Sequence, residues 1–154
     1  MTAAKLTLLG LTLLCLNVFA QDISTTEAAL NRLDNESRNW VQSSCPRSLG
    51  PSLWLNCVNR EIGALRTKPI KSETLSSELL AWIEQSCPRS LGPSLNINCV
   101  ERETAAVKSG VPSIGQLPKR ERDWIAQSCP RSLGPSLYIN CVLREGRAMG
   151  VNLN

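Results

Sequence analysis

CPRSLGPSLWLNCVNRE, at residues 45–61, is the stretch that recurs in this chain. The second copy begins at Cys87 and the third at Cys129, which is a period of 42 residues without an insertion. Fourteen of its seventeen positions are identical in all three copies, and a tryptophan stands five residues before each first cysteine (Trp40, Trp82, Trp124). A fixed period of about 20 to 50 residues is typical of repeat proteins. The sequence therefore predicts three copies of one small structural unit.

Each copy predicts two helices joined by a short turn. Apolar residues fall at helical spacing before each first cysteine, and Ser24-Thr25-Thr26-Glu27 forms a capping-box pattern, so a first helix is expected from about Thr25 to Ser44. The Leu49-Gly50-Pro51 step interrupts the helix, because proline has no N–H to donate but suits the first turn of a new helix. Second helices are expected over residues 51–66, 93–108 and 135–149, with glycine C-caps at Gly110 and Gly150.

The predicted fold class is all-α, with three tandem disulfide-stapled helical hairpins after a cleaved N-terminal signal peptide. The predicted boundaries are 1–20 for the signal peptide, 21–66 for repeat 1, 72–110 for repeat 2 and 117–154 for repeat 3. The three recurring tryptophans are expected to be core anchors, whereas Trp54 and Tyr138, at a variable position of the repeat, are expected to face solvent. The linker 108–116 contains glycine and proline and is expected to be more flexible than 67–71.

The first twenty residues have the pattern of an export signal. Lys5 precedes an apolar run over residues 6–19, and Val18-Phe19-Ala20 places small residues where a signal peptidase cuts. The run is shorter than the ~20 residues that span a bilayer. Cleavage before Gln21 would remove Cys15 and leave a net charge of +3 and six cysteines, an even number for an oxidising compartment.

Six cysteines allow fifteen pairings. Because a duplicated unit brings its own pair, the repeat favours Cys45–Cys57, Cys87–Cys99 and Cys129–Cys141. Redox chemistry would call for a Cys-x-x-Cys pair, and zinc would call for four ligands at closer spacing. We therefore expect structural disulfides, with no metal and no cofactor.

The sequence also argues against an enzyme. It contains no histidine, which excludes the usual Ser-His and Cys-His nucleophiles. Glu61 and its copies are the only recurring carboxylates, so the repeat has no carboxylate pair for acid–base work. Asn56, Arg60 and Glu61 are expected to act locally, with Asn56 and Arg60 bound to turn carbonyls and Glu61 to a basic neighbour.

The function predicted is that of a secreted or periplasmic binding protein that presents near-identical Pro-Arg-Ser-Leu-Gly turns three times, which suits avidity toward a multivalent partner. The alternative is an inhibitor of an extracellular hydrolase, such as a trypsin-like protease, acting through a rigid Arg-Ser bond. The candidate contact residues are the repeated turn residues and two aromatic side chains: Arg47, Ser48, Arg89, Ser90, Arg131, Ser132, Trp54 and Tyr138.

The expected partner is an extracytoplasmic protein or polymer. The charge of +3 is weak for nucleic acid, which typically binds a dense basic face. No stretch after the signal peptide is apolar enough to suggest a stable membrane span.

Overall fold

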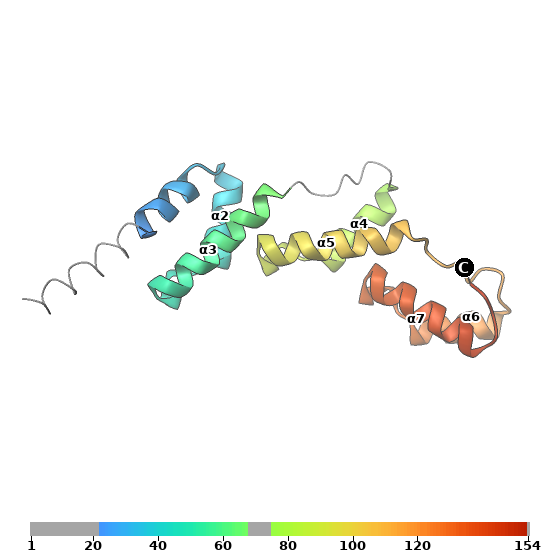
Figure 1. Ribbon diagram of the computed structural model, residues 1–154. Helices are drawn as coiled ribbons and strands as arrows, with labels where there is room; N and C mark the ends of the chain where they lie inside the picture. Colours follow the sequence, from blue (N-terminus) through green and yellow to red (C-terminus); the bar gives the residue numbers. More distant parts are fainter. Residues whose placement is uncertain (1–21, 68–74, 154) are drawn as a thin grey trace, which may run out of the picture. The chain divides into compact units, whose positions relative to one another are not determined.

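The computed structural model describes residues 22–67 and 75–153, and within these residues every regular secondary-structure element is a helix, with no β-strand (Figure 1). The predicted signal peptide and most of the first linker lie outside the described residues. The all-α class is confirmed. The chain divides into two compact units, one formed by residues up to Thr67 together with Gly92–Ser94, and the other by Lys68–Leu91 with Leu95–Asn154. The three repeat boundaries remain a prediction from the sequence.

The N-terminal segment forms two helices where one was expected. Residues 22–31 are helical, and α2 (Asn35–Ser44) starts after a break. The Asp34 carboxylate caps α2 by accepting a hydrogen bond from the Ser37 N–H at 2.9 Å. The Arg38 side chain donates to the Asn31 carbonyl at 2.8 Å and to the Leu33 carbonyl at 2.9 Å, which satisfies carbonyls that the break frees. The single-helix prediction is wrong because this Asp-x-x-Ser cap outweighs the continuing apolar pattern.

The helices that follow each turn begin where proline predicts. They are α3 (Pro51–Arg66), α5 (Pro93–Lys108) and α7 (Pro135–Ala148). The helices that precede the turns in the second and third repeats are α4 (Ser77–Ser86) and α6 (Lys119–Ser128). Each turn is a short 3₁₀ helix, η1 (Arg47–Leu49), η2 (Arg89–Leu91) and η3 (Arg131–Leu133), closed by a glycine with φ between 82° and 84°. Gly110 and Gly150 also have positive φ, as expected for glycine C-caps.

The core of the first unit contains a tryptophan that was expected to face solvent. Trp54 is only 5 % exposed and packs in one cluster with Leu30 and Val41. The expectation is wrong because Leu30, at the end of the 22–31 helix, belongs to the same cluster and helps to cover the variable face of α3. Tyr138, at the equivalent position of α7, is partly buried against the core of its own repeat.

The recurring tryptophans do not share one environment. Trp82 is buried and Trp40 is half-buried, but Trp124 is 58 % exposed, so the prediction of a core anchor is wrong for Trp124. The neighbouring Ile125 is 1 % exposed and occupies the core of the third repeat with Leu117, Cys129 and Val142.

The second linker also contributes to that core. Ile114 packs against it and Leu117 belongs to it, and the Leu117 N–H donates to the Ile114 carbonyl at 3.1 Å. The comparison of flexibility with residues 67–71 falls largely outside the described residues.

Candidate functional site

Each repeat carries its own disulfide. The pairs are Cys45–Cys57, Cys87–Cys99 and Cys129–Cys141, with Cα–Cα distances of 5.8, 5.7 and 5.7 Å. The predicted pairing is confirmed. Each bridge ties the end of the first helix to the second turn of the next helix, and three such bridges indicate an oxidising, extracytoplasmic environment. Among the described residues, no helix is long and apolar enough to cross a membrane.

The recurring glutamate binds the start of another repeat's helix. Within the first unit, Glu61 is 1 % exposed and accepts hydrogen bonds from the Ser94 N–H at 2.6 Å and the Ser94 hydroxyl at 2.9 Å. Ser94 is the second residue of α5, where backbone N–H groups have no partner inside the helix. The Arg60 guanidinium also donates to Glu61, at 2.9 and 2.8 Å. Glu61 therefore links repeat 1 to the helix start of repeat 2.

The same contact recurs within the second unit. Glu103 is 2 % exposed and accepts from the Ser136 N–H at 2.6 Å and from its hydroxyl at 2.9 Å. Arg102 donates to Glu103 at 2.9 Å, as Arg60 does to Glu61. We call Glu61 and Glu103 the junction carboxylates.

The junction carboxylates are held in the ionised form. Burial acts to raise the pKa of Glu61, but the hydrogen bonds from the Ser94 N–H, the Arg60 side chain and the Ser94 hydroxyl outweigh it and lower that pKa below its ordinary value of 4.5. Burial likewise acts to raise the pKa of Glu103, and the bonds from Ser136 and Arg102 lower it overall.

Close packing accompanies each of these contacts. A Cβ added to Gly92 would lie 2.9 Å from the Ser44 Cβ, and one added to Gly134 would lie 3.1 Å from the Ser86 Cβ. In the second unit, Trp82 adds three contacts to repeat 3, two with the turn and one with α7. Its Nε1 donates to the Arg131 carbonyl at 2.9 Å, the Arg131 guanidinium lies 4.3 Å from its ring centre, and Tyr138 meets it edge-on at 5.4 Å.

Two expectations for the polar residues of the repeat change as a result. Glu61 does bind a basic neighbour, but Arg60 pairs with Glu61 and does not reach the turn carbonyls. Asn56 is exposed, and it is Asn96 that donates to a turn-side carbonyl, that of Cys87, at 2.6 Å. The links from Glu61 to Ser94 and from Glu103 to Ser136 were not predicted from the sequence, and each joins residues 33 positions apart.

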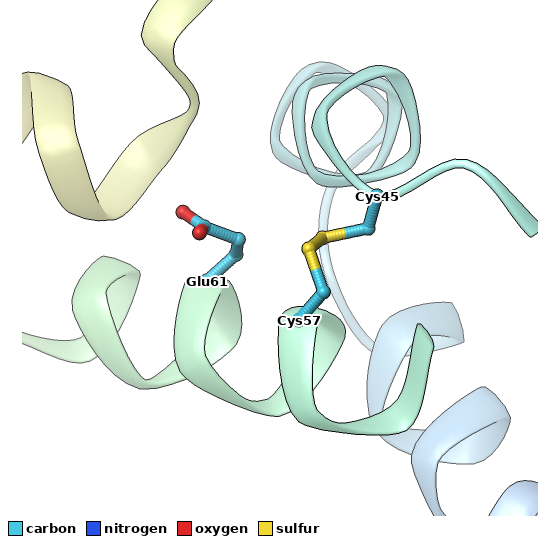
Figure 2. A group of neighbouring side chains, drawn as sticks. All are labelled: Cys45, Cys57 and Glu61. Atoms are coloured by element: carbon cyan, nitrogen blue, oxygen red, sulfur yellow. A yellow bond between two sulfur atoms is a disulfide. The ribbon is translucent and has the colours of Figure 1, made fainter. Parts of the chain in front are cut away.

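One cluster has the composition of a metal site without its chemistry. Cys45, Cys57 and Glu61 place donor atoms within 4.8 Å of one another, and Figure 2 shows the carboxylate beside the disulfide on one side of α3. The two sulfur atoms are bonded to each other and lack the thiolate charge that binds metals. The cluster therefore does not support a metal site.

The arginine and serine residues proposed for partner contact lie on the turns. Ser48, Ser90 and Ser132 are exposed in the three 3₁₀ helices, as are the arginines that precede them. Arg47 forms an ion pair with Glu27 and lies 4.6 Å from the Trp54 ring centre, while Arg131 pairs with Glu78 at 3.5 Å. The Arg-Ser peptide bonds lie in 3₁₀ helices, whereas a protease inhibitor presents an extended segment. This geometry does not favour the inhibitor alternative.

Most of the exposed large apolar side chains among the described residues belong to the repeated stretch. Each repeat places one leucine in the 3₁₀ helix and one in the first turn of the following helix, and these side chains are 42 % to 60 % exposed: Leu49, Leu53, Leu91, Leu95, Leu133 and Leu137. We call each pair a leucine patch. In repeat 3 the patch lines one surface hollow together with Asn140, Cys141 and Arg144.

Comparisons with protein-family models, with curated proteins and with solved structures find no match for this chain.

Proposed function

We propose that this chain is a non-enzymatic extracytoplasmic binding protein whose three leucine patches engage a multivalent protein or polymer partner. One observation carries the proposal: among the described residues, six of the eight large hydrophobic side chains that are exposed belong to these patches. Single exposed leucines are ordinary on protein surfaces. A pair that recurs at the same place in three repeats is a regular feature of the surface.

The fold accounts for most of the identity among the repeats, but not for the leucines. The cysteines form the bridges, the glycines adopt positive φ, and the junction carboxylates bind the next helix. Val58 and Val142 are fully buried. The leucine patches are also identical in the three repeats, but they have no comparable role in the fold. The same holds for Asn56 and its copies, which are exposed.

The charge around each patch suggests the partner's chemistry. Arg60, Arg102 and Arg144 have side chains that are 65 %, 66 % and 73 % exposed, and Arg144 lines the same hollow as the leucine patch of repeat 3. An apolar partner surface that carries acidic groups would complement this arrangement. Three weak contacts of this kind gain strength together through avidity, because the second and third bind at a high effective concentration.

Stepwise removal of the patches tests this proposal. The chain is immobilised, and the extracellular and envelope fractions of the producing organism are passed over it. Leu53→Ser, Leu95→Ser and Leu137→Ser are compared singly, in pairs and together. The retained amount of a specifically bound component should fall roughly 10-fold or more for each patch removed, as expected for avidity.

The matched control is Val111→Ser, which removes an exposed apolar side chain outside the repeat stretch. It should leave retention unchanged. Retention that is the same in the triple variant as in the unchanged chain would overturn the proposal.

A further inference from the structure

We infer that the chain associates end to end with further copies of itself, by repeating between chains the contact that joins its own repeats. The contact has two halves. The donor face is the Gly-Pro-Ser helix start of a repeat, and the acceptor face is the glutamate, serine and tryptophan of the repeat before it. Among the described residues, the donor face of repeat 1 and the acceptor face of repeat 3 do not take part in this contact.

The unused donor face lies at the start of α3. Pro51 and Ser52 are exposed, and a Cβ added to Gly50 would meet nothing within 4 Å. The equivalent Gly92, Pro93 and Ser94 are all buried. No side chain caps the start of α3, so the helix offers the same N–H donors that bind a carboxylate in the other two repeats.

The unused acceptor face lies on repeat 3. The Glu145 side chain is 25 % exposed, against 2 % to 3 % for the junction carboxylates, and it accepts hydrogen bonds from Arg144 at 3.0 and 3.1 Å. Ser128, the counterpart of Ser44 and Ser86, is exposed. Trp124 is 58 % exposed, whereas Trp82 is buried against the Arg131 carbonyl. Trp124 therefore lacks, among the described residues, the cover that repeat 3 gives to Trp82.

The second copy is the occupant that fits, because both halves of the contact already bind each other in this chain. Glu61 binds Ser94, and Glu103 binds Ser136, with the same two donor atoms and distances that agree to the tenth of an ångström. Contact between different surfaces of identical chains is heterologous, so it produces open chains or closed rings.

Two differences make the contact between chains weaker than the contact within a chain. Glu78 pairs with Arg131, but the equivalent position in repeat 3 is the exposed Arg120, and Arg47 of the next copy already pairs with its own Glu27. Trp54, at the position of Tyr138, is already buried in its own core, so Trp124 would lack the ring contact that Trp82 makes. A linker also supplies an effective concentration of roughly the millimolar order inside the chain. Association should therefore be seen at high protein concentration.

Sedimentation velocity of the purified, disulfide-bonded chain tests the inference from about 10 μM to about 1 mM, the range set by that effective concentration. The average sedimentation coefficient should rise with concentration through dimer and larger species. Ser52→Asp places a carboxylate against Glu145, and Glu145→Ala removes the acceptor. Each should weaken association at least 10-fold. Ser52→Asp also suits the first turn of its own helix, so the variant should fold.

Two controls make equal changes of charge away from both faces. Ser77→Asp alters the exposed first residue of α4, and Glu84→Ala removes an exposed carboxylate of the same helix. Both should associate like the unchanged chain.

Mixing the two interface variants separates end-to-end contact from a symmetric dimer. Ser52→Asp keeps a working acceptor face, and Glu145→Ala keeps a working donor face, so the mixture should form dimers and nothing larger. A chain that stays monomeric to about 1 mM, the upper end of that range, overturns the inference. Association that neither variant weakens overturns it as well. Loss of the leucine patches should not alter association, so this inference and the proposed binding function can fail separately.

Discussion

Glu103→Ala should destabilise the chain far more than the same change at Glu145. Glu103 accepts two short hydrogen bonds from Ser136 and is almost fully buried. A hydrogen bond to a charged group contributes about 1.5–3 kcal/mol. The two bonds together would give about 3–6 kcal/mol, but burial of the carboxylate costs desolvation, and water can reach the freed donors once the contact opens. We expect a net loss of about 2–4 kcal/mol in the free energy of unfolding.

The third repeat supplies the matched control for this prediction. Glu145 has the same arginine neighbour, but no serine among the described residues donates to it, and its partly exposed ion pair contributes about 0–1 kcal/mol. Urea unfolding of the oxidised chain measures both free energies, and hydrogen exchange of the Ser136 amide reports the contact locally. Equal losses in the two variants would show that the glutamate acts only inside its own repeat, and would contradict a stabilising link from Glu103 to Ser136.

Three further predictions concern acid, the disulfides and the glycines. The fold lowers the pKa of the junction carboxylates from 4.5, so their contribution to stability is complete above that pH and is lost as the pH falls through the lowered pKa. The urea midpoint of unfolding should therefore drop in acid, and it should drop less in the variant in which Glu61 and Glu103 are both replaced by glutamine. Replacing Cys129 and Cys141 with serine should lower the free energy of unfolding by about 2–5 kcal/mol, mainly in the third repeat. Faster amide hydrogen exchange spread evenly over the chain would contradict a loss confined to that repeat. Gly50→Ala and Gly134→Ala should each lower the free energy of unfolding by about 1–3 kcal/mol, measured by thermal unfolding, because φ is 84° at both positions. The loss should be larger at Gly134, where the new Cβ would lie 3.1 Å from the Ser86 Cβ. A larger loss at Gly50 would contradict the close packing.

The parts of the fold that depend on nearby residues were predictable from the sequence. Proline fixes the start of the second helices at Pro51, Pro93 and Pro135, and a fixed cysteine spacing with one local geometry gives three equivalent bridges. Both features lie within about a dozen residues, so the pattern of the repeat determines them.

The environments that depend on a neighbouring repeat were not predictable in the same way. Trp82 and Trp124 stand at the same position of the repeat, yet one is buried by repeat 3 and the other is exposed. A pattern within one repeat assigns one role to both, because the carbonyl that binds the Trp82 indole belongs to Arg131, 49 positions further along the chain. Trp54 is buried for a related reason, since the 22–31 helix ends in Leu30, a member of the same core cluster.

The partner of Glu61 escaped prediction because its hydrogen bonds join residues 33 positions apart. The available signal was the identity of the glutamate and of the Gly-Pro-Ser helix start in all three copies, since a proline-led helix exposes N–H donors that an anion can satisfy. The exposed leucines are the residues for which the structure finds no such role.

The unfolding free energy of the triple variant Leu53→Ser, Leu95→Ser and Leu137→Ser shows whether the leucine patches are needed for folding, and its measurement requires no knowledge of the partner. If the leucine patches serve binding and not folding, each change should alter stability by no more than about 0.5 kcal/mol, as for an ordinary surface position. A loss of about 2 kcal/mol or more for each leucine, of the size that core truncations cause, would contradict the claim and show that the repeated leucines are kept to build the hairpin.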